Sequence, residues 1–258
     1  MNKYNKVPEI SLIFWLTKLI STGQGESISD MSAQLFHNQI IGAAFTVIWS
    51  TILFLIFLYL QMKSEKYRPL FYWLTVALLA VFGTILADGL SAGAGVPHFG
   101  TMIIFAILML ISFVIWFAQT KSLSIHDIKT RKAECFYWLT VLFSFALGTA
   151  MGDWAAFDLG LGLLNTGLIL GAIFLGILYY RLAAKPKENS FMEILSFWLA
   201  YILTRPIGAS FADYFGYKWM NGILGNRGMS VIWLVLFVIF LTIIVVKYNK
   251  GNKSEAGK

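Results

Sequence analysis

Long stretches without a charged residue are the feature that most limits how this chain can fold. Four runs contain no Asp, Glu, Lys or Arg: 38–62, 89–120, 159–180 and 228–246. Each run supplies the roughly 20 apolar residues that a helix needs to cross about 30 Å of hydrocarbon. Four further runs are nearly clean or carry internal charges: 69–87, 135–152, 10–29 and 194–212. We therefore expect an all-α polytopic membrane protein with eight transmembrane helices in a single domain over residues 1–258.

The composition excludes the other broad classes. Hydrophobic residues make up 58% of the chain and charged residues only 13%, about half of the ~25% usual in soluble domains. Too few polar residues remain to cover the surface of a soluble protein. The single cysteine, Cys135, excludes an intrachain disulfide and disfavours a cysteine metal site.

Charge placement predicts the topology. If the predicted loops alternate between two sides, one side holds 16 of the 20 basic residues, and the other holds only Lys218 and Arg227. By the positive-inside rule, both termini are cytoplasmic. The net charge of +7 then reflects topology, and we expect no nucleic acid among the partners. The basic tail, 249–258, is expected to be solvated near anionic headgroups.

A fourfold internal repeat begins each time with an aromatic residue followed by tryptophan. The four tryptophans are Trp15, Trp73, Trp138 and Trp198. Ten residues after each comes a glycine: Gly25, Gly83, Gly148 and Gly208. Fifteen residues after each comes an aspartate: Asp30, Asp88, Asp153 and Asp213. The repeats cover approximately residues 8–62, 66–120, 131–183 and 191–248, and each contains one such helix and one plain apolar helix.

Two helices per repeat give all four repeats the same orientation. They are then related by pseudo-rotational symmetry about the membrane normal. At 1.5 Å per residue, the glycines lie about 15 Å and the aspartates about 22 Å from the tryptophans along each helix. The plain helices are expected to form a lipid-facing outer ring. Whether the repeats form one fourfold ring or two pairs, and the oligomeric state, stay open.

The segments FYWLTVLFSFALGTAMGDW (136–154) and YILTRPIGASFAD (201–213) carry a family resemblance. The chain resembles, over about residues 8–248, bacterial membrane proteins built from four tandem repeats of two transmembrane segments with a signature tryptophan. That family is described as a repeat of unknown function or an uncharacterised membrane-anchored protein. The resemblance implies the fold and a bacterial cytoplasmic (inner) membrane location, but no settled activity. The segment 221–228 is less regular than the resemblance implies.

The repeated residues have structural and functional interpretations. The four tryptophans are predicted to be packing residues and anchors in the aromatic belt. The four glycines are predicted to permit close helix contact, with a local helix break as the alternative. The four aspartates either cap helix ends or line the bundle interior. Partners four residues earlier on the same helix face, Glu26, Thr84 and Thr149, favour the interior.

Two basic residues lie within predicted spans. Lys18 is three residues past Trp15, so it either snorkels to the interface or has a functional role. Arg205 lies deeper and is followed by Pro206, which frees a backbone carbonyl. If the ring closes in chain order, Arg205 is expected to pair with Glu26 or Asp30, and the alternative is that it binds carbonyls freed by Pro206.

The in-span charges predict the function. Five carboxylates, Glu26 and the four aspartates, face two basic groups, Lys18 and Arg205, so the core is formally −3. Oxygen ligands without Cys or His favour hard cations such as Mn²⁺, Mg²⁺ or Ca²⁺. We therefore predict a transporter or channel for a small cation, with the four aspartates as metal ligands and protons as the exchanged ion. Glu26, Thr84 and Thr149 are predicted to complete the ion-binding site, and Arg205 and Lys18 to serve in gating or charge pairing. No cofactor and no enzyme activity are expected. The alternatives are a transporter of an organic solute or lipid headgroup, and an assembly or scaffold protein.

Overall fold

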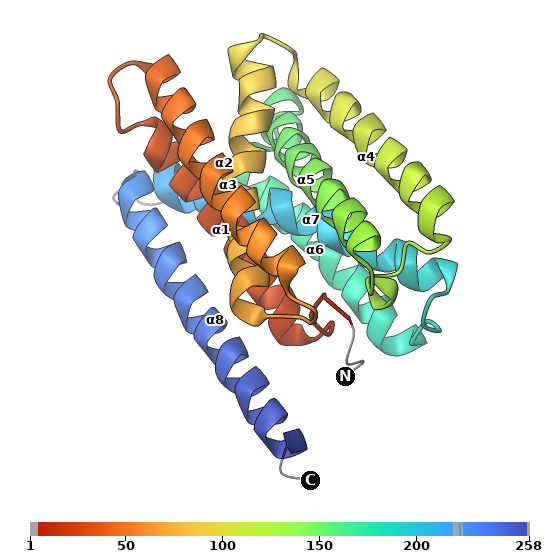
Figure 1. Ribbon diagram of the computed structural model, residues 1–258. Coiled ribbons are helices and arrows are strands. Elements are labelled where there is room, and N and C mark those ends of the chain that lie inside the picture. The colour runs from red at the N-terminus through yellow and green to blue at the C-terminus, as the bar shows by residue number, and fades with distance from the viewer. Residues whose placement is uncertain (1–4, 219–221, 223, 257–258) are drawn as a thin grey trace.

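The computed structural model describes residues 5–218, 222 and 224–256, and within these ranges all regular structure is helical (Figure 1). The predicted all-α fold is confirmed. The described chain contains eight α-helices: α1 (Leu12–Ala33), α2 (Gln39–Lys63), α3 (Pro69–Asp88), α4 (His98–Thr120), α5 (Arg131–Asp153), α6 (Gly162–Ala184), α7 (Phe191–Asp213) and α8 (Gly225–Ala256).

Local sequence sets the helix bounds. The side chains of Ser11, Asn38, Thr130 and Ser190 accept hydrogen bonds from backbone N–H groups in the first turns of α1, α2, α5 and α7. Such caps satisfy amide groups that have no partner within the helix. Helix α3 instead begins with Pro69, whose missing N–H costs nothing at that position.

Seven of the described helices, all except α1, are long and apolar enough to span a membrane, and they indicate a multi-pass membrane protein. Helix α1 carries Lys18, Glu26 and Asp30 and many hydroxyl side chains, which lower its hydropathy. It packs against α2, α3, α7 and α8, so neighbouring helices shield its polar residues. That α1 spans a membrane stays a prediction.

The first helices of the four repeats form a closed inner ring. Helix α1 contacts α3, α3 contacts α5, α5 contacts α7, and α7 returns to α1. The repeats therefore form one fourfold ring in chain order, which the sequence left open.

The second helix of each repeat packs on the first helix of the next repeat. Helix α2 packs on α3, α4 on α5 and α6 on α7, while α8 closes the circle on α1. Only 22% to 28% of the apolar stretches of α2, α4, α6 and α8 is buried, against 67% to 72% for α3, α5 and α7. The predicted outer ring is confirmed as the outward-facing layer, and each repeat depends on its neighbour for burial.

The inner helices run parallel, so the bundle has a tryptophan end, where α1, α3, α5 and α7 begin, and an aspartate end, where they finish. Helix α1 begins and α8 ends at the tryptophan end (Figure 1). The predicted tail 249–258 continues α8 as far as Ala256. Residues 257 and 258 lie outside the described residues, as do 221 and 223 of the irregular segment 221–228.

Candidate functional site

The four tryptophans pack in a cyclic register at the tryptophan end. The aromatic residue before each tryptophan contacts the tryptophan of the next repeat, with ring centroids 5.4 to 6.1 Å apart. The four contacts are Phe14–Trp73, Tyr72–Trp138, Tyr137–Trp198 and Phe197–Trp15. All four tryptophans are buried. The four tryptophans therefore act as packing residues, as predicted. Their rings are enclosed by protein and are not exposed as belt anchors.

The four glycines lie where adjacent inner helices cross. A Cβ at each glycine would overlap the residue seven positions after the tryptophan of the next repeat. The four close contacts are Gly25–Ala80, Gly83–Phe145, Gly148–Arg205 and Gly208–Thr22. All four glycines lie inside α-helices, so close contact rather than a helix break accounts for them.

Arg205 occupies one of these crossings and is buried, with 1% of its surface exposed. Its Nη2 donates to Glu26 Oε2 on α1 and to the Thr84 hydroxyl on α3. Its Nη1 donates to the backbone carbonyl of Thr22, 3.1 Å away on α1. The ion pair expected from the repeat offsets is therefore present, and one guanidinium joins three inner helices.

Helix α7 continues through Pro206 without interruption. The described bonds of Arg205 reach α1 and α3, and none reaches a carbonyl of its own helix below Pro206. The alternative, in which Arg205 binds backbone carbonyls freed by Pro206, is therefore not observed.

Lys18 does not snorkel. Its side chain is 1% exposed, and its Nζ lies 3.6 Å from the ring centroid of Phe145 on α5 and 4.1 Å from that of Tyr201 on α7. These cation–π contacts place the ammonium inside the inner ring. Within the described chain it has no ion pair with an acid.

Three of the four aspartates end an inner helix. Helices α3, α5 and α7 finish at Asp88, Asp153 and Asp213, and a π-helical turn follows each of them. Asp88 and Asp153 make no side-chain capping bond to these turns. Asp30 lies one turn before the end of α1. All four side chains are partly exposed at the aspartate end, so helix capping does not explain the repeated aspartate.

Three carboxylates from the first and last repeats come together there. Oxygen atoms of Glu26, Asp30 and Asp213 lie within 4.8 Å of one another. We call these three residues the carboxylate cluster. Asp88 and Asp153, which the sequence placed in the same ligand set, lie outside it, although both interact electrostatically with Glu26 and Arg205. The cluster thus forms at the seam between α1 and α7 and not as a symmetric ring.

Two residues that the sequence did not single out hold Asp30 in place. The Tyr217 hydroxyl donates to Asp30 Oδ2 at 2.9 Å, and the Asn226 side-chain amide donates to the same oxygen at 3.4 Å. Tyr217 lies four residues after Asp213, in the π-helical turn, and Asn226 lies in the irregular segment 221–228. That irregularity was the only sequence signal for Asn226, and Tyr217 had none.

The remaining predicted residues are divided between the site and its surroundings. Thr84 donates to Glu26 Oε2 at 3.3 Å and so belongs to the site. Thr149 donates to the carbonyl of Phe145 on its own helix. His98 and Asp158, which belong to no predicted set, pair at 2.9 Å on the aspartate end.

Two buried polar contacts lie at the tryptophan end. The hydroxyls of Tyr72 and Tyr137, from repeats two and three, lie 2.5 Å apart and both residues are fully buried. Lys6 precedes α1 and forms a buried ion pair with Glu134 at the start of α5, with Nζ 2.7 Å from Oε2.

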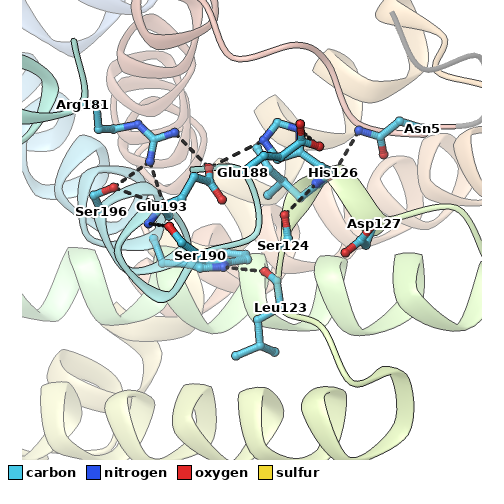
Figure 2. Close-up of polar contacts among 12 residues, drawn as sticks. Asn5, Leu123, Ser124, His126, Asp127, Arg181, Glu188, Ser190, Glu193 and Ser196 are labelled. Atoms are coloured by element: carbon cyan, nitrogen blue, oxygen red, sulfur yellow. Dashed lines mark hydrogen bonds and ion pairs between the residues drawn. The ribbon is translucent and has the colours of Figure 1, made fainter. Parts of the chain in front are cut away.

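A polar network joins two loops at the same end (Figure 2). Arg181 donates to the carbonyl and carboxylate of Glu193, and His126 Nε2 lies 3.6 Å from the same carboxylate. Contact with Glu193 raises the pKa of His126 above its usual value, against an opposing effect of partial burial. Glu188, 3.9 Å from His126 Nδ1, also raises it and Arg181 lowers it.

The sequence matches the family described as "Repeat of Unknown Function (DUF347)" over residues 71–122, 136–186 and 196–248. The chain belongs to this family. The three matched stretches correspond to the second, third and fourth repeats. The first repeat lies outside them, although α1 makes the same glycine and tryptophan contacts in the ring. No curated protein and no solved structure matches this chain.

Proposed function

We propose that this protein transports a small hard cation of the Mn²⁺, Mg²⁺ or Ca²⁺ class, exchanged for protons, and that the carboxylate cluster binds the cation. The observation that carries the proposal is the approach of three carboxylates, from Glu26, Asp30 and Asp213, to within 4.8 Å of one another. A hard divalent cation bound at about 2.0–2.6 Å from each oxygen bridges ligands at such separations.

The hydrogen bonds leave oxygens free for a cation. In the described chain, Arg205 and Thr84 engage Glu26 only through Oε2, and Tyr217 and Asn226 engage Asp30 only through Oδ2. The second oxygen of each carboxylate is available, as is the carboxylate of Asp213. Tyr217 and Asn226 fix the orientation of Asp30, which reduces the entropy lost on binding.

Charge also favours a divalent ion. Arg205 and Glu26 neutralise each other, so Asp30 and Asp213 supply two negative charges when both are ionised. Helices α3, α5 and α7 point their C-termini, the negative ends of their dipoles, towards this region. An aspartate at a helix C-terminus is electrostatically unfavourable, and a bound cation relieves that repulsion. Asp88 and Asp153 add to the local negative potential and attract cations from solution.

The same contacts argue against an organic anion or lipid headgroup at this site. The two Nη atoms of Arg205 already donate to Glu26, Thr84 and Thr22. They would have to give up their partners on α1 and α3 to bind an anionic cargo. A purely structural polar core would not need oxygens without partners at a partly exposed end.

The proposed setting is a bacterial inner membrane with both termini in the cytoplasm. The tryptophan end would then face the cytoplasm, since it carries most of the basic loop residues. The aspartate end would open to the outside. The aromatic layer and the Tyr72–Tyr137 contact would form the inner closure that must open for a cation to pass.

Thermal unfolding of the purified, chelator-treated protein with added MnCl₂, MgCl₂ or CaCl₂ tests the proposal. We expect the melting temperature to rise with at least one of these salts, because a ligand that binds the folded state stabilises it. Asp213→Asn and Asp30→Asn should remove the rise, while Asp127→Asn, in a loop at the opposite end, should keep it.

Uptake of the responding cation into proteoliposomes that contain a pH indicator then tests transport and proton exchange. Wild-type cation response and uptake in both cluster variants would contradict the proposal.

A further inference from the structure

Lys18 is a buried cation without an acidic partner. Its Nζ contacts the ring faces of Phe145 and Tyr201, and in the described chain it donates to no oxygen atom. Ring faces attract a cation but are poor hydrogen-bond acceptors, so the ammonium donors are not satisfied. A buried charge without a hydrogen-bonding counterion is unfavourable.

A second donor next to Lys18 has no acceptor. The Nε of Arg205 is buried and has no hydrogen-bond partner among the described atoms. Lys18 and Arg205 are close enough for their charges to repel each other. The inner ring therefore presents unpartnered cationic donors from α1 and α7 between the carboxylate cluster and the tyrosines.

The charges and the packing around Lys18 indicate what kind of ion could bind its ammonium group. Arg205 is neutralised by Glu26, and no acid in the described chain pairs with Lys18, so its ammonium form calls for one negative charge at this place. The helices around its ammonium contribute Phe145 and Tyr201, neither of which is acidic. A divalent anion would exceed the available charge, and a bulky one would have to enter a closely packed ring.

We infer that Lys18 and the Nε of Arg205 form a binding site for a small monovalent anion, of the halide, nitrate or small-carboxylate class. The anion accepts hydrogen bonds from the two cationic groups and screens their repulsion. It lies on the tryptophan side of the Arg205–Glu26 pair, and Asp30 and Asp213 of the carboxylate cluster lie on the other side. The site stands on the unpartnered donors and does not depend on the proposed cation transport.

Thermal unfolding without divalent cations tests this site directly. The protein is held in chelator and sodium gluconate, and gluconate is replaced by chloride, bromide, nitrate or acetate at constant ionic strength. We expect one or more of the small anions to raise the melting temperature by about 5 °C near saturation. Lys18→Met should abolish the rise. Lys132→Met, which changes an exposed lysine, should retain it.

An equal rise in Lys18→Met, or no anion-specific rise in the wild-type protein, would overturn the inference. The absence of an anion-specific rise in the wild-type protein would mean that Lys18 is neutral or bound only by water. If Lys18→Met does not fold, crystals of the wild-type protein grown in bromide provide the test. An anomalous peak beside Lys18 Nζ supports the site, whereas peaks confined to the surface refute it. The response to divalent salts, measured separately, shows whether the cation proposal fails independently.

Discussion

Arg205 on α7 forms a buried ion pair with Glu26 on α1, and this pair joins the last repeat to the first. Among the four ring junctions in the described chain, only this one is closed by opposite charges. The pair lies where two glycines, Gly148 and Gly208, bring α5, α7 and α1 into close contact. It separates the carboxylates of the aspartate end from the Lys18 region.

The first prediction concerns the coupling of this pair. Arg205→Gln should lower the free energy of unfolding by about 3 kcal/mol, because it leaves a buried carboxylate without its cation. In the double variant with Glu26→Gln, the loss should be smaller than the sum of the two single losses. Denaturant unfolding in micelles measures the free energy of unfolding of the wild-type protein, the two single variants and the double variant. Strictly additive losses would mean that the two side chains are not coupled.

The second prediction concerns the glycine crossings. Gly148→Ala places a methyl group against Arg205 and should cost about 2 kcal/mol through overpacking. Gly171→Ala in α6 is the matched control, since nothing lies within 4 Å of its Cβ position. That control should be neutral or stabilising by up to about 1 kcal/mol from helix propensity. Equal melting temperatures for the two variants would contradict the close contact.

The third prediction ranks the carboxylates. Asp213→Asn and Asp30→Asn should abolish cation binding because they remove ligands from the cluster. Asp88→Asn and Asp153→Asn should weaken it only several-fold, because their charges act at a distance. If all four aspartates were metal ligands, as the sequence predicts, either of these last two variants would also abolish the response. Titrations of the four variants with the responding cation test this ranking, and equal losses in Asp153→Asn and Asp213→Asn would favour the symmetric ring.

The fourth prediction concerns the tyrosines at the tryptophan end. Tyr72→Phe removes one partner of the 2.5 Å contact with Tyr137 and should cost about 1–2 kcal/mol. The double change Tyr72→Phe, Tyr137→Phe should cost less than twice as much, since no hydroxyl is then left buried without its partner. Tyr179→Phe, at an exposed position on α6, controls for the loss of a hydroxyl. A double variant with fully additive losses would show that the contact contributes nothing.

The fifth prediction is a pH dependence. The pKa of His126 is raised in the folded protein by Glu193, so protonated His126 stabilises the fold. This contribution is fully present below the unfolded pKa of about 6.5 and is lost as the pH rises through the folded value. The melting temperature should therefore fall between pH 6 and pH 8.5 by more in the wild-type protein than in His126→Gln. Parallel curves for the two proteins would contradict the Glu193 contact.

Much of the fold could be predicted because the relevant signals are local or periodic. Uncharged runs located seven apolar helices, and the repeat of Trp, Gly and Asp located the inner ones, including the polar α1. The Arg205–Glu26 contact also followed from the repeat once the ring closes in chain order, because their offsets differ by only one helical turn, about 6 Å, which a long Arg side chain spans. The tryptophans were assigned partly to a membrane belt, since a sequence does not show that each ring is covered by the preceding repeat.

The sequence determined the helical class, the four-part repeat and the parallel direction of its inner helices, because hydrophobic length and residue offsets fix these within each repeat. Only the tertiary structure decided that the ring closes through α1 and α7, and that each outer helix packs on the next repeat. It also decided that Glu26 joins Asp30 and Asp213 while Asp88 and Asp153 stay apart. These outcomes depend on side chains from distant parts of the chain, whose contacts exist only once the four repeats pack around one axis.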